Sequence, residues 1–488
     1  MSDDGVPDSD VPDRDAPAEL VTWRELLRDT TVVLGDSARS RWMCEVAASE
    51  DGDRFLSMLD EPATERMVAH LDAMLARHQT GEPLQYVLGR WGFRRLDLAV
   101  DARALIPRPE TEQVAEAAIA VARGFGPGRT LVDLGTGTGA IGLAAADELP
   151  RDTTKVWLTD ADDGALDLAR ANLAGLGRAA TGVRVASGSW YDALPDDVRA
   201  DVIVSNPPYV AEGSPDIEPI VDTWEPAGAL YSGADGLDAI NAIVAGAPDR
   251  LRPGGALVLE IGADQGDAVR HLLTSTGFVG VEIRPDLAGH DRIAIGARPT
   301  AIIDEGDLRI RHLTNRIDDY VLLLRWLQTP AVLEWYEGRD SDFDLDDIID
   351  EYGPGGEHEL EGTEPMIVEL AGRSVGYVQL YELTRYATEF GLDDEPRGGQ
   401  GIWSLDLFVG EPELHETGLG RRIVRSVAEY LLHERAARDV VIMPYPENER
   451  AVRSYAAAGF VAAVIVPDHE IHEGVMRDGL RMHYRPER

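Results

Sequence analysis

The sequence predicts an α/β protein with a short helical segment, an open and largely parallel sheet, and a separate α+β domain. A buried strand over 131–134 runs into a glycine-rich turn and then an apolar helix, which is typical of a strand–turn–helix unit. A second buried strand, 202–204, stops at Asn206-Pro-Pro-Tyr209, because proline has no N–H to donate to a sheet. Farther along, a hairpin over 364–380 and a strand over 403–409 start a new pattern.

Length and composition indicate a globular protein. The 488 residues are enough for two or three domains, and 44% of them are hydrophobic and 27% charged. The single cysteine, Cys44, excludes an internal disulfide and a cysteine-rich zinc site, and we see no metal-ligand set. No run approaches the roughly 18 apolar residues that a membrane span needs, and the N-terminus is unlike a signal peptide. We expect a cytoplasmic protein with no membrane partner.

The formal net charge of −42 argues against a nucleic-acid-binding surface, which would carry clusters of basic residues. Lys155 is the one lysine, and arginines supply the other strongly basic side chains. This composition fits either a high-GC genome or a salt-adapted cytoplasm, and the sequence leaves both open. We expect no direct nucleic-acid partner.

The first 80 residues predict a tail and a small helical domain. Residues 1–18 are rich in Asp, Pro and Ser and have little to bury, which predicts a disordered acidic tail. Over 19–80, apolar side chains recur at helical spacing. This domain either helps to hold a substrate or serves packing alone. A hairpin-like linker over 83–105 follows, and a helix then starts at Ile106-Pro-Arg-Pro-Glu-Thr-Glu112.

The turn after the strand over 131–134 is a candidate ligand-binding loop. Its glycines let the backbone come close to a ligand, although this spacing is shared with dinucleotide-binding folds. The next strand ends in Asp160, where an acid can bind two ribose hydroxyls; Asp162 and Asp163 are better placed to cap the helix that follows. Trp190 either stacks on an adenine or belongs to the core. The candidate cofactor residues are Gly135, Thr136, Gly137, Thr138, Gly139, Asp160, Trp190 and Asn206.

The Asn206–Tyr209 segment has the chemistry of a site for an amide or amine. The Asn206 side-chain oxygen and the Pro207 carbonyl are two acceptors that can hold both hydrogens of a planar NH2 group. This arrangement directs the nitrogen lone pair toward an electrophile. Tyr209, after Pro208, offers a face on which a flat group can stack. The alternative is a strand-ending turn, since Asn-Pro is a common turn signal.

Taken together, these parts resemble one family, the peptide chain release factor N(5)-glutamine methyltransferases. The resemblance covers about Leu20 to Ala297. It rests on the Gly135–Gly139 loop, Ser205-Asn-Pro-Pro-Tyr209, Pro83-Leu-Gln-Tyr86, Ile106–Glu112, Glu225-Pro226 and Asp286–Arg292. One departure is Ser189, where the family has an acid.

The resemblance implies a class I methyltransferase domain over 81–297 with a Rossmann-like seven-stranded sheet and S-adenosylmethionine as cofactor. Asn206 and Pro207 would be catalytic, and Asn206, Pro207, Pro208 and Tyr209 would bind the substrate. That substrate would be the glutamine of the Gly-Gly-Gln motif in class I peptide chain release factors. Asn-Pro-Pro-Tyr is shared with DNA adenine methyltransferases, so the alternative is an N6-adenine nucleic-acid methyltransferase.

After a linker over 298–306, residues 307–488 predict a second domain. A glycine-rich turn, Glu416-Thr-Gly-Leu-Gly-Arg-Arg422, opens a helix with one apolar face. Such a turn either binds a pyrophosphate or is an ordinary helix start. With Asn448–Phe460 downstream, the domain resembles a GCN5-related N-acetyltransferase (GNAT), most of all aminoglycoside 6′-N-acetyltransferases and siderophore acyltransferases. One departure is His415, where the broad family has Gln or Arg.

This second resemblance implies acetyl-CoA bound by Gly418, Gly420, Arg421 and Asn448 and a small amine as acetyl acceptor. Asp406 would be the base and Tyr455 would protonate the leaving thiolate; the alternatives are a solvated Asp406 and a core Tyr455. The many acidic residues of this half would attract a polycationic amine, although acidic residues are frequent throughout the chain. A non-catalytic interaction module is the alternative for this half. Arg397-Gly-Gly-Gln-Gly401 is either a glycine-rich loop, which we favour, or a self-methylation site at Gln400.

Overall fold

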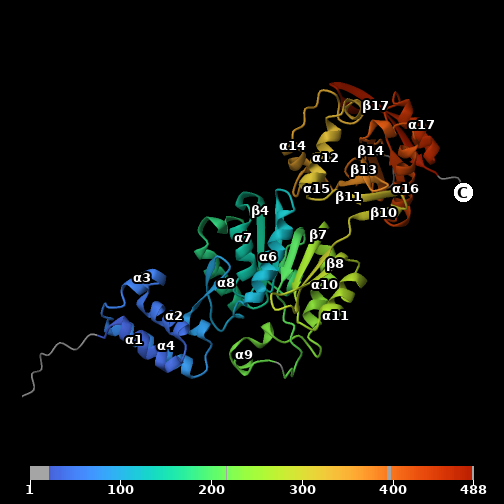
Figure 1. Cartoon of the computed structure of the whole chain (residues 1–488). Coiled ribbons are helices and arrows are strands. Elements are labelled where there is room, and N and C mark those ends of the chain that lie inside the picture. Colours follow the sequence, from blue (N-terminus) through green and yellow to red (C-terminus); the bar gives the residue numbers. More distant parts are fainter. Residues whose placement is uncertain (1–20, 216, 393–396, 486–488) are drawn as a thin grey trace, which may run out of the picture. The chain divides into compact units, whose positions relative to one another are not determined.

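The computed structural model describes residues 21–215, 217–392 and 397–485 (Figure 1). The acidic tail predicted over 1–18 lies outside these residues. Contacts divide the chain into two compact units. The first holds the chain up to Pro107 together with Gly213–Ala229, and the second holds Arg108–Glu212 and the chain from Leu230 onward. Within the described ranges, no helix combines the length and hydropathy needed to cross a membrane.

The first unit consists of helices followed by a hairpin. Thr22 and Glu25 form a reciprocal capping box at the start of α1, and Asp36 accepts two backbone N–H groups at the start of α2. Trp23 and Phe55 lie edge to face in the core. The elements are α1 (Trp23–Leu34), α2 (Ser37–Ala48), α3 (Gly52–Ser57), α4 (Glu65–Gln79), α5 (Leu84–Leu88), β1 (Arg90–Phe93), β2 (Leu96–Ala99) and α9 (Pro219–Trp224). The antiparallel β1–β2 pair is the hairpin expected within 83–105.

Residues 213–229 belong to this unit although they come much later in the sequence. The backbone N–H of Ile106 donates to the Glu225 carboxylate at 3.2 Å. Trp224 packs against the small cluster that contains Tyr86 and Ile106. The hydrogen bond between Ile106 and Glu225 brings together two motifs that are far apart in the sequence, Ile106–Glu112 and Glu225-Pro226.

The second unit begins with a seven-stranded sheet in the order β5-β4-β3-β6-β7-β9-β8. Its neighbours are parallel up to β7, and β9 is antiparallel to both β7 and β8. The strands are β3 (Arg129–Leu134), β4 (Thr154–Asp160), β5 (Val183–Ser187), β6 (Ala200–Ser205), β7 (Leu251–Glu260), β8 (Val279–Pro285) and β9 (Asp291–Ala297). The helices are α6 (Pro109–Arg123), α7 (Ala140–Glu148), α8 (Asp163–Gly175), α10 (Asp238–Arg250) and α11 (Gly266–Ser275).

The sheet order explains where a ligand can bind. β3 lies between β4 and β6, and their carboxyl ends point to the same edge of the sheet. The Gly135–Gly139 loop follows β3, Asp160 is the last residue of β4, and the Asn206–Tyr209 segment follows β6. Loops at the carboxyl edge of a parallel sheet are the usual ligand site of such folds.

The same unit continues with an eight-stranded sheet in the order β10-β11-β12-β13-β14-β15-β17-β16. The strands are β10 (Ala301–Glu305), β11 (Leu308–His312), β12 (Glu364–Leu370), β13 (Arg373–Glu382), β14 (Ile402–Val409), β15 (Asp439–Ile442), β16 (Phe460–His472) and β17 (Val475–Tyr484). The helices are α12 (Ile317–Leu327), α13 (Pro330–Leu333), α14 (Leu345–Tyr352), α15 (Glu357–Glu361), α16 (Leu419–His433) and α17 (Glu449–Ala458). The segment predicted as a linker over 298–306 contains β10, which pairs with β11.

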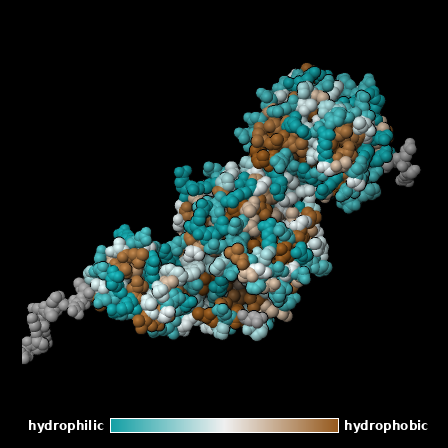
Figure 2. Space-filling view, viewed as in Figure 1, coloured by the Kyte–Doolittle hydropathy of each residue, from teal (hydrophilic) through white to brown (hydrophobic). Residues whose placement is uncertain are grey.

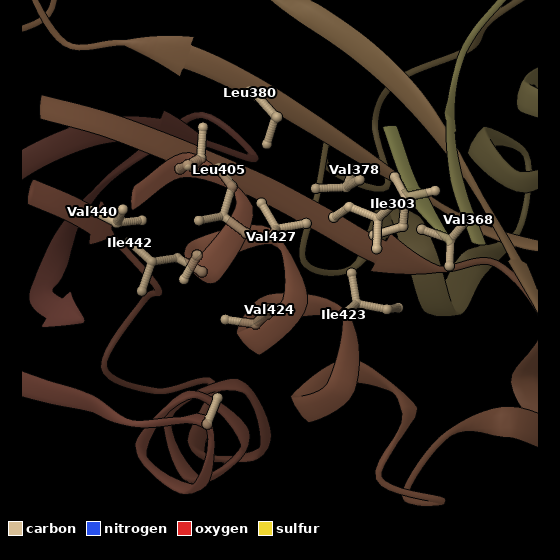
Figure 3. Packing of buried hydrophobic residues seen from close by; sticks show 14 of the residues in the cluster. Ile303, Val368, Val378, Leu380, Leu405, Ile423, Val424, Val427, Val440 and Ile442 are labelled. Carbon is tan, nitrogen blue, oxygen red and sulfur yellow. The ribbon is translucent and has the colours of Figure 1, made fainter. Parts of the chain in front are cut away.

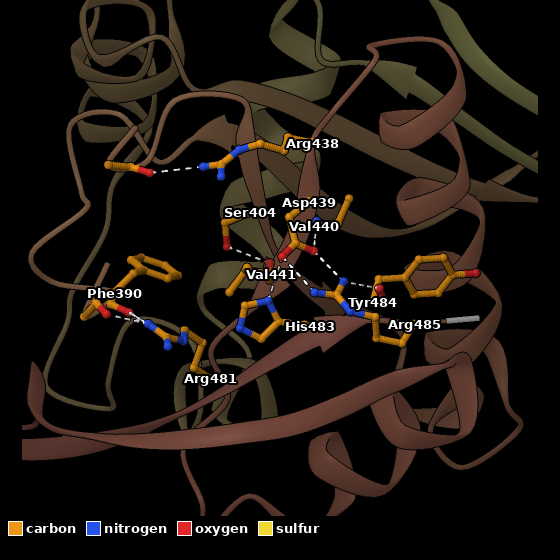
Figure 4. A network of polar contacts seen from close by, with 12 residues as sticks. Phe390, Ser404, Arg438, Asp439, Val440, Val441, Arg481, His483, Tyr484 and Arg485 are labelled. Carbon is orange, nitrogen blue, oxygen red and sulfur yellow. Dashed lines mark hydrogen bonds and ion pairs between the residues drawn. The ribbon is translucent and has the colours of Figure 1, made fainter. Parts of the chain in front are cut away.

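Helix α16 covers one face of this sheet. Ile423 and Val427 of the helix and Val378 and Leu405 of the strands are fully buried in one cluster (Figure 3). These helix residues lie on the apolar face predicted from the sequence. A second, polar network joins β15 to the end of β17, with Asp439 at its centre (Figure 4).

The eight-stranded sheet is irregular in two places. The pairing of β14 with β15 is parallel and reaches only Ser404, whereas β14 continues to Val409, so the two strands part from each other beyond that point. At the other end, β16 is an edge strand of 13 residues. Its pairing with β17 is irregular between Val466 and Glu470, a stretch that contains Pro467.

Candidate functional site

The glycine-rich loop joins β3 to α7. Gly135, Gly137 and Gly139 have φ angles of 67°, 54° and 87°, a left-handed conformation that glycine adopts without strain. The N–H of Gly137 donates to Asp160 Oδ2 at 2.9 Å. The structure therefore brings the predicted loop and the acid at the end of β4 into direct contact.

Asp133 anchors this loop and keeps one oxygen without a partner. Its Oδ2 accepts from the Thr136 hydroxyl at 2.6 Å and from the Gly142 N–H at 2.9 Å. Its Oδ1 is buried and has no hydrogen-bond partner among the described residues. Burial raises the pKa of Asp133 to about 7, although both hydrogen bonds lower it. A buried acceptor beside a glycine loop fits a ligand with a donor group, such as the amino group of S-adenosylmethionine.

Trp190 and Asp160 flank the same loop. A Cβ atom on Gly135 would lie 3.4 Å from the Trp190 ring, so the ring contacts the loop, and Trp190 also packs against the core. Both Asp160 oxygens accept backbone N–H groups, from Gly137 and from Asp162. Asp162 caps α8 by accepting from the Ala165 N–H, as the sequence suggested, so Asp160 is not the cap of this helix.

The two threonines of the loop are buried. Thr136 is 7% exposed and gives its hydroxyl hydrogen to Asp133. Thr138 is 3% exposed, and its carbonyl accepts the Asn172 amide at 2.9 Å. We therefore expect the backbone of these two positions, rather than their side chains, to serve a ligand.

The Asn206–Tyr209 segment leaves β6 beside this loop and is held from two sides. Asn206 Nδ2 donates to Thr111 Oγ1 at 3.1 Å. Gln265 Nε2 donates to the Tyr209 carbonyl at 3.1 Å and to the Gly236 carbonyl at 3.3 Å. The segment is thus a fixed platform at the carboxyl edge of the sheet.

Two buried residues of this platform, Thr111 and Glu260, were not predicted as site residues. The Thr111 hydroxyl donates to Glu260 Oε2 at 2.6 Å, and the Tyr209 hydroxyl donates to Glu260 Oε1 at 3.2 Å. Arg292 lies close to the same tyrosine and also donates to Asp286. The sequence contains one signal that could have identified Glu260, since it is the single carboxylate in the otherwise apolar run 256–261.

The third region is a cavity of about 800 Å³ in the C-terminal half, which opens where β14 parts from β15. All the residues that the sequence predicted for this half line it: Asp406, Tyr455, Gly418, Gly420, Arg421 and Asn448. They come from β14 and from the N-terminal ends and body of α16 and α17.

Asp406 is tied to a polar chain of side chains. Gln379 Nε2 donates to Asp406 Oδ2 at 3.1 Å. The Tyr377 hydroxyl and the His358 ring each lie 3.0 Å from Gln379 Oε1. Burial raises the pKa of Asp406, which makes it a stronger base than an exposed aspartate. Burial and the Asp406 charge raise the pKa of Tyr455, so its hydroxyl keeps its proton at neutral pH.

The other end of the cavity has the features of a pyrophosphate site. Gly418 caps the 15-residue helix α16 with φ of 88°, and a Cβ there would meet nothing within 4 Å. Arg421 lines the cavity, whereas Arg422 pairs with Asp307 at 2.7 Å. Asn448 Oδ1 caps α17 by accepting from the Ala451 N–H. An open helix N-terminus beside an arginine fits the phosphates of coenzyme A.

The acceptor side of this cavity is acidic. Glu337, Glu361, Glu389 and Glu470 line it together with Asp406. Burial and neighbouring carboxylates raise the pKa of Glu337 to about 7. These glutamates were not predicted individually, because acidic residues occur throughout the chain and only the fold shows which of them converge.

Three family models match the chain. The PrmC N-terminal domain matches residues 22–89, the methyltransferase small domain matches 119–221, and the acetyltransferase (GNAT) domain matches 316–466. The first match covers the N-terminal helices and the third covers the eight-stranded sheet from β12 into β16. The second covers the strands β3 to β6 and extends into residues 213–221 of the first unit.

Curated relatives are release factor glutamine methyltransferases. The protein of Xylella fastidiosa is 43% identical over 240 residues, which are 49% of this chain and 85% of that protein. The protein of Burkholderia pseudomallei is 39% identical over 281 residues, 57% of this chain and 96% of that protein. The protein of Pseudomonas aeruginosa is 42% identical over 279 residues, 57% of this chain and 99% of that protein.

Solved structures of acetyltransferases align with part of the chain. The aminoglycoside acetyltransferase AAC(6′)-Ib in complex with coenzyme A is 25% identical and aligns with 36% of this chain and 93% of that one, with a TM-score of 0.31.

Proposed function

The chain belongs to the release factor glutamine methyltransferase family, and on that premise we propose that it methylates the side-chain amide of a glutamine in class I peptide chain release factors. The predicted fold class is confirmed: a helical N-terminal domain, a seven-stranded methyltransferase sheet and a GNAT domain. The methyltransferase half uses S-adenosylmethionine, and the GNAT half uses acetyl-CoA. We propose that the enzyme is bifunctional and acetylates a small amine.

The observation that carries the first activity is the fixed carboxamide of Asn206 next to the Pro207 carbonyl. An amide nitrogen is a poor nucleophile because its lone pair is conjugated. Asn206 Oδ1 and the Pro207 oxygen each accept one hydrogen of the substrate NH2 group, which returns electron density to the nitrogen and fixes its direction. S-adenosylmethionine supplies an electrophilic methyl group when it is bound. The nitrogen loses one proton in the transfer, and this proton stays hydrogen-bonded to one of the two acceptors until solvent takes it.

The observation that supports the second activity is the shared cavity of Asp406 and Tyr455. Asp406 would take a proton from the ammonium group of the acceptor, whose nitrogen could then form the bond to the acetyl carbon, and Tyr455 would donate the proton that the thiolate takes up as the C–S bond breaks. Acetyl-CoA supplies the acetyl group as a thioester when it is bound. Arg421 and the N-terminus of α16 would hold its phosphates.

We propose that the acetyl acceptor carries more than one positive charge, as aminoglycosides do. Glu337, Glu470 and Asp406 line the acceptor side of the cavity and would bind separate ammonium groups. This proposal concerns the class of amine and not one compound.

A crossed experiment tests both activities. The wild type, Asn206→Ala and Asp406→Asn are each assayed for methyl transfer from labelled S-adenosylmethionine to a purified bacterial release factor, and for acetyl transfer to an aminoglycoside. We expect Asn206→Ala to lose about 100-fold in methyl transfer and to keep acetyl transfer. We expect Asp406→Asn to lose about 100-fold in acetyl transfer and to keep methyl transfer.

Other results would identify other functions. Label on DNA and not on the release factor would indicate a nucleic-acid adenine methyltransferase. Label on Gln400 of the chain would indicate self-methylation. A calorimetric titration that detects no acetyl-CoA binding would indicate that the GNAT half is an interaction module.

A further inference from the structure

A buried carboxylate lies beneath the substrate platform of the methyltransferase half and has no part in the chemistry proposed above. Glu260 ends β7 and is 1% exposed, and its neighbours Leu259 and Ile261 are fully buried. Burying a carboxylate in apolar surroundings costs free energy unless partners satisfy its oxygens. Both oxygens are satisfied, by Thr111 and by Tyr209.

The contact between Glu260 and Thr111 determines which way the Asn206 amide faces. The Oγ1–Oε2 distance is 2.6 Å, which is typical of a hydroxyl that donates to a carboxylate. A threonine hydroxyl has one hydrogen, so Thr111 can only accept from its other neighbour. That neighbour is Asn206, 3.1 Å away, and the amide must therefore present its nitrogen to Thr111.

We propose that Thr111 and Glu260 are positioning residues that hold the Asn206 carboxamide with its oxygen free for the NH2 group of the substrate glutamine. This inference rests on the proposed function. If the amide turned by half a rotation, its own NH2 would face the NH2 of the substrate, and two donors would meet. Asn206 Oδ1 would then no longer form a pair of acceptors with the Pro207 carbonyl.

The same carboxylate fixes the other end of the platform. The Tyr209 hydroxyl donates to Glu260 Oε1 at 3.2 Å. Arg292 on β9 donates to the Ile261 carbonyl at 3.0 Å and lies 3.5 Å from the Tyr209 hydroxyl. One residue of β7 thus holds both Asn206, through Thr111, and Tyr209.

Protonation of Glu260 would release this constraint. Burial raises the pKa of Glu260 to about 7; Thr111, Arg292 and Tyr209 lower it, and Glu110 on α6 raises it. Two further charged groups belong to this network: Asp286, which pairs with Arg292, and Arg108, which lowers the pKa of Tyr209. A protonated Glu260 donates to Thr111, and the Thr111 hydrogen is then free to bind Asn206 Oδ1. The orienting effect is therefore present above about pH 7 and is lost as the pH falls below it.

The test compares wild type, Thr111→Val, Thr111→Ser and Glu260→Gln in the full chain. The assay is methyl transfer from labelled S-adenosylmethionine to a purified bacterial release factor, with kcat and KM measured on both sides of pH 7. Valine has the shape of threonine without its hydroxyl, whereas serine keeps the hydroxyl. Thermal unfolding of each variant reports whether it folds.

We expect Thr111→Val to lower kcat about 100-fold with little change in the KM for the release factor, as a misplaced reacting group does. Thr111→Ser should recover most of that loss. Glu260→Gln, which donates to Thr111 at every pH, should lower kcat and remove the fall of the rate below pH 7.

Three results would overturn the inference while wild type transfers methyl groups normally. They are a wild-type kcat in Thr111→Val, an equal loss in Thr111→Ser, and a wild-type rate that is flat through pH 7. The pH dependence of the wild-type rate needs no variant, so it tests the inference even if a substitution prevents folding. Absence of methyl transfer by the wild type would overturn the proposed function itself, and the inference with it.

Discussion

Asp439 is the residue on which the polar network of the GNAT sheet depends (Figure 4). Its oxygens accept from His483 Nδ1 at 2.8 Å and from Arg485 at 2.7 and 3.1 Å. Burial alone would raise the pKa of Asp439, but these hydrogen bonds hold it well below its usual range. A carboxylate with a depressed pKa contributes stability above the pKa of the unfolded chain and loses that contribution as the pH falls.

We therefore expect Asp439→Asn to destabilise the GNAT domain by about 2 kcal/mol at neutral pH, which lowers its melting temperature by several degrees. The difference from wild type should shrink as the pH is lowered below about 4, where the aspartate of the unfolded chain takes up a proton while the folded carboxylate still stays charged. Thermal unfolding followed by circular dichroism at both pH values is the measurement. Asp304→Asn, an exposed aspartate on β10, is the matched control and should change little. Equal melting of Asp439→Asn and wild type at neutral pH would contradict this account.

At the scale of elements, the loop before α10 supports the platform after β6. A Cβ on Gly236 would lie 2.3 Å from the Tyr209 carbonyl oxygen, and Gly236 has φ of 76°. An alanine there must push the Asn206–Tyr209 segment away. We expect Gly236→Ala to lower the kcat of methyl transfer at least about 10-fold.

The control for this change is Gly213→Ala. Gly213 has nearly the same φ, 75°, but a Cβ there would meet nothing within 4 Å. Both variants carry the cost of a left-handed alanine, and only Gly236→Ala adds the collision with the platform. Similar kinetics of the two variants would show that backbone strain, and not the contact with Tyr209, explains any loss.

Strands, glycine loops and hairpins were predictable because their signals are local. The strand before Gly135, the stop at Asn206-Pro207 and the hairpin over 364–380 follow from runs of a few residues. The partnership of Thr111 with Glu260 was not predictable, since 149 residues separate the two and only the packing of α6 against β7 brings them together. The strand β10 was missed because it is short, with a polar end that resembles a linker.

At the scale of the whole molecule, the excess of acidic residues sets the response to salt. The chain has 88 acidic and 46 strongly basic residues, a net charge of −42. Hydrophilic residues cover most of the face shown in Figure 2. Charges of one sign repel across such a surface, and salt screens them, with a Debye length of about 10 Å at 0.1 M.

We expect the melting temperature to rise when potassium chloride is increased from about 0.02 M to about 0.5 M, because screening relieves this repulsion. Thermal unfolding at constant pH over a salt series is the measurement. A series with potassium glutamate separates ionic strength from effects of the chloride ion. A melting temperature that falls with salt would mean that attractive ion pairs outweigh the repulsion.

The irregular pairing near Pro467 has a consequence for aggregation. β16 is an edge strand, and its exposed apolar side chains include Val464, Ile465 and Ile471. An unprotected edge of this kind is a template on which strands of other molecules can add. Proline lacks the N–H that such addition needs, and the positive φ of Asp468 bends the strand where the register slips. Pro467 and Asp468 thus protect this edge, so a chain that lost both would form intermolecular sheets as its concentration rose.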